Sequence, residues 1–235
     1  MKYGESSVRL YLVGHIGKVA VLSLGLIILL TQQTLAGPVS APAAPLSGIM
    51  AEPSHSGMIE QGTVISLPEH MTLKERKPLL DRLYRRLRGA SSGRAAKPIA
   101  DAIEQVWLTS GDDNIDFIMQ NAILAMEEED FVVAEELLDR VIELRPGYAE
   151  GWNKRAMVHF MKKEFEKALM KLRQTLALDS KHFQALHGLA LVMQEVGDHR
   201  SALQAYRVLL HNHPQFSEAT EAIKELNREV NGQDT

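Results

Sequence analysis

Residues 149–182 read AEGWNKRAMVHFMKKEFEKALMKLRQTLALDSKH, and this stretch matches the sequence on both sides of it. When residues 115–148 and 183–216 are aligned with it, small side chains fall into two columns. These columns are Ala122, Ala156 and Ala190, and Ala134, Ala168 and Ala202. A column of methyl groups lets two helix axes approach closely, while larger side chains fill the grooves beside it. The fixed period therefore predicts three copies of one unit, each an antiparallel pair of helices.

Each unit ends at a position that suits a helix stop. Pro146 and Pro214 occupy this position in the outer two units, and Ser180 occupies it in the middle one. Proline disfavours helical geometry in the residue before it. Since no alternating strand pattern occurs anywhere in the chain, the sequence predicts an all-α fold.

The period, the alanine columns, the terminal proline and Trp152 near the start of the middle unit resemble tetratricopeptide repeats over about residues 112–216. The departures from the family pattern are Asn121, Arg155, His159 and Ser180. The resemblance implies a superhelix of stacked helix pairs that binds other proteins without catalysis. Residues 72–230 as a whole are similar to small exported repeat proteins of diderm bacteria, which implies a periplasmic location.

Further helices are predicted on both sides of the three units. Residues 72–111 form a helical pair and are a candidate degenerate first unit, because Tyr84, Leu87 and Ala100 fall in the repeat columns. Its first helix begins either at a capping box opened by Thr72 or with Pro78 as the first helical residue. Residues 217–235 are predicted to form a capping helix and a tail.

Residues 1–36 have the layout of a signal peptide. Basic side chains precede the apolar run VAVLSLGLIILL (19–30). This run has 12 residues, whereas a helix needs roughly 20 to cross a bilayer. Small residues before position 37 predict cleavage after Ala36, with a second possible site near Ala41. An uncleaved anchor in the inner membrane is the alternative.

The composition of the remaining chain restricts its partners. Residues 37–71 carry five of the nine prolines among Ala, Ser and Gly, which predicts a disordered linker. The chain has no cysteine, so its stability must come from packing. Without residues 1–36 the chain has 23 basic and 29 acidic side chains, which gives a net charge of about −6. This balance argues against nucleic acid, and against a membrane unless the amino-terminal segment is retained.

The family resemblance implies that the first helix of each unit lines a concave groove. Carrying the register across the units gives nine inward positions: Met119, Ile123, Met126, Asn153, Met157, Phe160, His187, Leu191 and Gln194. The set is largely apolar and rich in methionine, which adapts its shape to different partners. We therefore expect the groove to bind a peptide segment of another protein. The alternatives are that these side chains are core, and that the protein associates with itself through an exposed end of the stack.

One recognition mode is excluded by the residues on these helices. Family members that bind an acidic carboxy-terminal tail use a clamp of Lys, Asn and Arg. The matching positions here are Met119, Ile123, Lys154, Gln184 and Gly188. A single lysine does not make such a clamp.

No set of residues points to catalysis, a cofactor or a metal. The His side chains do not cluster by spacing, and His211 and His213 are explained by their place at a helix end. The acidic run 127–130 spans a turn, where Asp130 is expected to cap the next helix. The basic stretch 82–97 is most simply a solvated helix face, with an acidic partner or lipid headgroups as the alternative.

Overall fold

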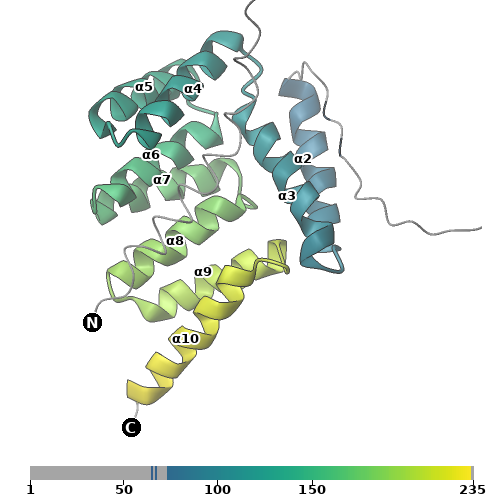
Figure 1. The fold of residues 1–235 in the computed structure, drawn as a ribbon, viewed down its shortest axis with the longest axis vertical. Coiled ribbons are helices and arrows are strands. Elements are labelled where there is room, and N and C mark those ends of the chain that lie inside the picture. Colours follow the sequence, from purple (N-terminus) through teal and green to yellow (C-terminus); the bar gives the residue numbers. More distant parts are fainter. Residues whose placement is uncertain (1–64, 66, 68–72, 234–235) are drawn as a thin grey trace, which may run out of the picture. The chain divides into compact units, whose positions relative to one another are not determined.

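The computed structural model describes residues 65, 67 and 73–233, and this part of the chain contains helices and no strands (Figure 1). The helices are α2 (Leu73–Arg88), α3 (Gly93–Leu108), α4 (Asp113–Glu127), α5 (Phe131–Leu144), α6 (Ala149–Met161), α7 (Phe165–Leu178), α8 (Phe183–Glu195), α9 (His199–Asn212) and α10 (Ser217–Gln233). The all-α prediction is confirmed for these residues. The predicted signal peptide (1–36) lies outside the described residues, as does the predicted linker (37–71) apart from residues 65 and 67.

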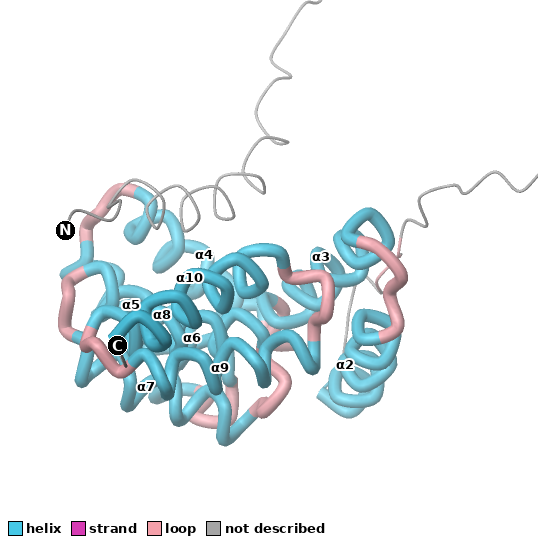
Figure 2. The backbone as a smooth tube through the Cα atoms, turned by 90° about the horizontal axis from the view of Figure 1, so that it is seen from below, coloured by secondary structure: helices cyan, strands magenta, loops and turns pink. Residues whose placement is uncertain are grey.

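Short connections separate the helices, as Figure 2 shows in pink. Asp112, Asp130 and Asp198 each cap a helix, because the carboxylate accepts hydrogen bonds from backbone N–H groups of the first turn. The role predicted for Asp130 is thus confirmed. Helix α2 begins at Leu73 and continues through Pro78, so that proline lies inside the helix rather than at its start.

The first helix of each unit ends in the same backbone conformation. Glu129, Lys163 and Gly197 follow α4, α6 and α8 in one column of the repeat, with φ of 60°, 61° and 80°. Left-handed geometry costs a residue with a side chain about 1 kcal/mol. Backbone hydrogen bonds hold these turns at Glu129 and Lys163, because the N–H of Asp130 donates to Ala125 and that of Glu164 donates to His159. A sharp reversal at this column sets the second helix of each unit against the first.

Helices α4 to α10 pack in sequence order. Helix pairs α4–α5, α6–α7 and α8–α9 form the units, and α5 packs on α6, α7 on α8 and α9 on α10. Both alanine columns lie at the centre of this packing, where each of the six side chains is at most 1% exposed: Ala122, Ala134, Ala156, Ala168, Ala190 and Ala202. The close approach of helix axes that the small columns predict is confirmed.

The α2–α3 hairpin contacts the stack at α6 and α9. Trp107 of α3 is 1% exposed and stacks on His182, with ring centroids 3.7 Å apart. Its indole Nε1 donates to the hydroxyl of Tyr84 at 3.1 Å, and Tyr84 donates in turn to Asp179. Gln215 Nε2 donates to the carbonyl of Ala90 in the hairpin turn. The hairpin is therefore fixed to the connections before α8 and α10.

This docking differs from the stacking of a fourth unit. A degenerate first unit at residues 72–111 would pack α3 on α4 as α5 packs on α6, but α3 makes at most slight contact with α4. Of the repeat-like columns of α2 and α3, Leu87 is fully buried and Tyr84 donates to Asp179 of the stack. Among the described helices, none is both long and apolar enough to cross a membrane.

Candidate protein-binding surface

The nine predicted groove residues fall into three columns, each with one member from every unit. Met119, Asn153 and His187 form the first, Ile123, Met157 and Leu191 the second, and Met126, Phe160 and Gln194 the third. The first column is buried in every unit, and the second is half-buried in every unit. In the third, Met126 is buried while the other two side chains are half-buried.

The buried members hold the units together. Met119 and Met126 are each 1% exposed and belong to the core between α4 and α5. Asn153 is 1% exposed and donates from Nδ2 to Glu150 at 3.2 Å. The ring of His187 meets that of Phe216 edge-on, with centroids 5.0 Å apart. For these four positions the structure therefore shows core packing, the alternative left open by the sequence.

The half-buried members keep part of their surface open to solvent. Ile123 and Met157 pack against the core between α4 and α5. The ring of Phe160 lies 5.9 Å from that of Phe165. Gln194 accepts a 2.6 Å hydrogen bond from Tyr206. With Leu191, these are the predicted groove positions that stay half-buried, and the name accessible groove is used below for these five residues: Ile123, Met157, Phe160, Leu191 and Gln194.

A buried charge cluster, absent from the sequence prediction, lies at the start of α6. Glu150 is 1% exposed; its carboxylate is 2.9 Å from Lys154 Nζ and 2.9 Å from His182 Nε2. Burial alone would raise the pKa of Glu150, but the charge of Lys154 and the hydrogen bond from His182 outweigh it and lower the pKa to about 2. Lys154, the one cation at the predicted clamp positions, is thus committed to an internal ion pair.

The sequence carries only a weak signal of this cluster. Glu150 resembles an ordinary first-turn acid facing a helix dipole. Its one clue is Lys154 four residues later, the spacing of an ion pair on one helix face. The contribution of His182 depends on the way α8 meets α6, which no local pattern encodes.

Glu135, His159 and Glu164 are close enough, among the described residues, to share a cation, with ligand atoms within 4.8 Å of one another. Each carboxylate already faces a lysine: Lys162 Nζ lies 2.6 Å from Glu135, and Lys167 Nζ lies 3.2 Å from Glu164. His159 Nδ1 lies 2.7 Å from Glu164, and burial lowers the pKa of the imidazole. The cluster is an ion-pair network that ties the turn after α6 to α5.

His211 and His213 do not form a site together. His211 is exposed, whereas His213 is buried, with its ring centroid 5.2 Å from that of Phe183 and 5.3 Å from that of Phe216. Burial lowers the pKa of His213 to about 4, so its imidazole is neutral at neutral pH. Aromatic packing, rather than a charge facing the helix end, accounts for this residue.

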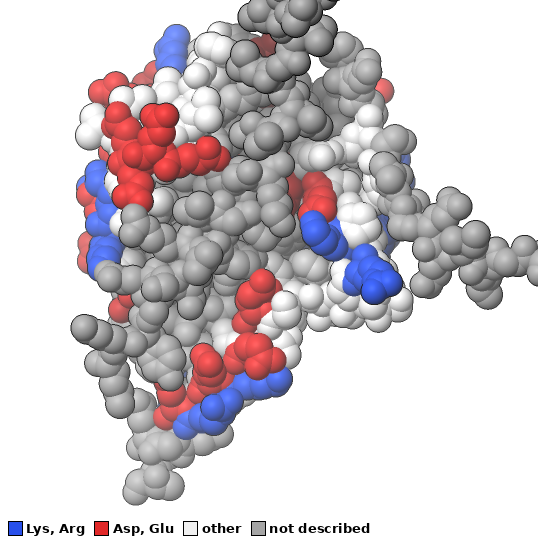
Figure 3. All heavy atoms as spheres, in the orientation of Figure 1, with Lys and Arg blue, Asp and Glu red and all other residues white. Residues whose placement is uncertain are grey.

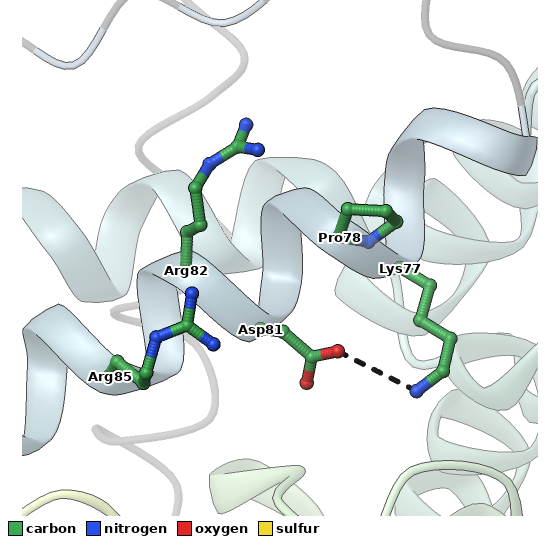
Figure 4. A pocket seen from close by; sticks show the side chains of 5 residues that line it. All are labelled: Lys77, Pro78, Asp81, Arg82 and Arg85. Atoms are coloured by element: carbon green, nitrogen blue, oxygen red, sulfur yellow. Dashed lines mark ion pairs between the residues drawn. The ribbon is translucent and has the colours of Figure 1, made fainter.

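The basic stretch lies on the exposed side of the hairpin. Arg82, Arg85, Arg86 and Arg88 are exposed, as expected of a solvated face. A shallow hollow on α2 is lined by Lys77, Pro78, Asp81, Arg82 and Arg85 (Figure 4). The Nζ of Lys77 lies 3.6 Å from Asp81 there. Because one helix supplies every lining residue, the hollow has no opposite wall to enclose a small molecule.

The chain was compared with protein families and with curated proteins. No protein-family profile matches the chain. A TPR repeat-containing protein of Rhizobium etli is 32% identical over 159 residues, which cover 68% of this chain and 78% of that protein. DnaJ homolog subfamily C member 3 of Gallus gallus is 26% identical over 129 residues, 54% of this chain and 25% of that protein.

Two solved structures show a more distant likeness to the chain. The Arabidopsis OM64 TPR domain has a TM-score of 0.48 at 18% identity, over 49% of this chain and 95% of that one. MamA has a TM-score of 0.48 at 21% identity, over 69% of this chain and 86% of that one. The identity and coverage shared with the Rhizobium etli protein, together with the repeated helix pairs, show that the chain belongs to the tetratricopeptide-repeat proteins.

Proposed function

We propose that the protein is a noncatalytic adaptor or scaffold that binds a peptide segment of a partner protein in the accessible groove. The observation that supports this is the column Ile123, Met157 and Leu191, half-buried on the first helix of three successive units. An apolar side chain that recurs at a fixed interval offers an extended or helical peptide several equivalent contacts. The surface is held by a packed core, so little ordering free energy opposes binding.

The chemistry of the groove favours an apolar segment. Met157 and Phe160 have no charge, and Lys154 beside them pairs with Glu150. Methionine adjusts its shape at small cost, which suits segments of more than one sequence. An acidic tail would find no free cation among these groove residues.

Substituting Met157→Glu and Phe160→Glu together is expected to reduce partner crosslinking in cells by at least tenfold. Two carboxylates would be desolvated beneath a bound apolar segment, a cost that exceeds the roughly 1.4 kcal/mol of a tenfold change. The measurement is the yield of crosslinked partner, with circular dichroism to verify that the variant is folded.

Met170→Glu is the matched control, because Met170 lies 59% exposed on α7 and outside the groove. We expect this variant to keep its partners. If the doubly substituted protein remains folded and retains every partner, the accessible groove is not the binding surface.

We further propose that the protein acts in the periplasm after removal of residues 1–36. The supporting feature is the apolar run 19–30, whose length suits a signal peptide. Mass spectrometry of the protein isolated from its cells should give an amino terminus at Gly37. An intact Met1 or Lys2 in the membrane fraction would contradict cleavage and support an anchored assembly factor instead.

A further inference from the structure

The outer face of α4 exposes apolar side chains in a regular stripe. Phe117 is 65% exposed and Leu124 is 48% exposed. The spacing from Phe117 to Leu124 is two helical turns, so both side chains lie on one face. Asn121 lies between them, and its Nδ2 donates to the carbonyl of Phe117 in the same helix. These three residues are called the α4 outer face below.

The same columns are buried in the next two units. In the repeat alignment, Phe117 corresponds to Gly151 and Ala185, and Leu124 corresponds to Val158 and Val192. Val158, Val192 and Ala185 are each fully buried. Only the first helix of the stack leaves these positions open.

A helix covers each of the equivalent faces. Val158 of α6 lies in one core with Val141 of α5. Ala185 and Val192 of α8 lie in another core with Leu172 of α7. At Gly151 the approach is so close that an added Cβ would lie 2.9 Å from Val141 Cγ1. The columns of Phe117 and Leu124 are therefore positions at which the second helix of a preceding unit packs.

Helix α3 does not cover this face of α4, and the opposite end of the stack does not expose a similar apolar face. Helix α3 is turned toward α6 and His182 instead of α4. At the other end, α10 buries Leu226 and exposes ion-paired side chains such as Glu221 and Lys224, 2.7 Å apart. One end of the stack is thus closed by charged residues, and the other presents an apolar face.

We propose that the α4 outer face binds an amphipathic, basic α-helix of a partner protein. We expect the bound element to be a helix, because the helices α5 and α7 cover the equivalent faces of α6 and α8. We expect that helix to be basic, because the apolar stripe is flanked at the two ends of α4 by exposed Asp113, Glu127 and Glu128. Acidic side chains also gather over α4 and α5 in Figure 3, at the upper left.

The same charges oppose a second copy as the occupant. Two α4 helices packed antiparallel would set the Asp113 end of one against the Glu127 end of the other, and like charges across a helix contact are repulsive. Residues 109–235 carry 22 acidic and 14 basic side chains, a net charge of −8. A helix with Lys and Arg beside its apolar stripe would be attracted by this field.

The chain itself provides a suitable probe. Helix α7 (165–178) covers the equivalent face of α8, and its sequence has three basic side chains and one acidic one. Helix α5 (131–144) covers the face of α6 but has four acidic side chains and one basic one. Fluorescently labelled, helix-locked peptides of these two sequences have the same length and repeat register but opposite net charge, +2 for 165–178 and −3 for 131–144. We expect the 165–178 peptide to bind the full chain at least tenfold more tightly than the 131–144 peptide, as measured by fluorescence anisotropy.

Substituting Phe117→Ser and Leu124→Ser should weaken binding of the 165–178 peptide at least tenfold. Both side chains are exposed, so the fold should persist. Val208→Ser on α9, where the side chain is 42% exposed, is the matched control and should bind as the native chain does.

Two results would overturn the proposal. One is binding of the 165–178 peptide that the Phe117 and Leu124 substitutions leave intact. The other is a dimer in sedimentation velocity that the same substitutions abolish, which would make the occupant a second copy.

Discussion

Replacing Trp107 with Ala is expected to lower the free energy of unfolding by about 3–5 kcal/mol. The side chain is 1% exposed and joins the α2–α3 hairpin to the repeats. Its ring stacks on His182 and lies 4.6 Å from that of Phe183, and its Nε1 donates to Tyr84. Truncation would leave a cavity between hairpin and stack and remove the donor from the Tyr84 hydroxyl.

Urea unfolding measures this loss, and limited proteolysis locates it. Cleavage within α2 or α3 should accelerate more than cleavage within α4–α9, because the hairpin loses its anchor. Trp152→Ala is the matched control, because Trp152 is half-buried and its polar and cation–π contacts are with the Pro146 carbonyl and Lys171, away from the hairpin. If Trp107→Ala costs no more than Trp152→Ala, the hairpin is not held by this side chain.

Substituting Glu150→Ala is expected to destabilise the protein by about 3–5 kcal/mol, because it leaves the buried cation Lys154 without its counter-charge. Lys154 is 7% exposed and His182 is fully buried. Without Glu150 the mostly buried ammonium and the buried imidazole would each lose their carboxylate partner. Thermal unfolding should show the loss as a fall in midpoint of roughly 2–4 °C per kcal/mol.

The contribution of Glu150 should also depend on pH. Its pKa falls from an ordinary 4.5 in the unfolded chain to about 2 in the folded one. The unfolded chain therefore takes up the proton first as the solution is acidified. The stabilisation is complete above about pH 4.5 and is lost toward pH 2, at about 1.4 kcal/mol per pH unit. The stability difference between native protein and Glu150→Gln, measured by urea unfolding, should narrow over this window.

A paired substitution tests whether charge or packing matters. Glu150→Gln with Lys154→Met keeps a hydrogen-bond acceptor for His182 and removes both members of the ion pair. We expect this variant to be more stable than Glu150→Gln alone, since no unpaired cation remains buried. If the loss in free energy of unfolding of the double variant equals the sum of the losses of the two single variants, the ion-pair explanation is wrong.

The repeat could be predicted because short sequence patterns determine it. The alanine columns, the caps such as Asp130 and the stops at Pro146 and Pro214 each act within one or two turns of a helix. They recur at a fixed interval, so each copy supports the others. These patterns determine helices and the packing of neighbours in sequence order.

The hairpin could not be placed in the same way. Tyr84, Leu87 and Ala100 match the repeat columns, yet contacts with Asp179 and His182 decide where α2 and α3 lie. Those partners are distant in sequence and belong to no column shared with the hairpin. A periodic match predicts a helix and its apolar face, but not which surface that face will meet.

The groove was predicted as nine positions, and the structure divides them. Met119 and Ile123 are both apolar residues on one helix, and sequence alone does not distinguish the buried one from the half-buried one. The two positions are four residues apart and so differ by only about 40° around the helix, which places them on one face in any periodic pattern. Only the packing of α4 on α5 resolves the difference.

The hairpin has a consequence for the order in which the protein folds. Contacts within and between neighbouring units join residues at most a few tens of positions apart, but Tyr84 and Asp179 are 95 residues apart, and Ala90 and Gln215 are 125 apart. Closing such long loops is slow and lowers folding rates. During synthesis α2 and α3 leave the ribosome before the repeats, yet their contact with Gln215 can form only after residue 215 emerges. The hairpin is therefore made before the repeats, but its contacts with Asp179 and Gln215 can form only after most of the stack has been made.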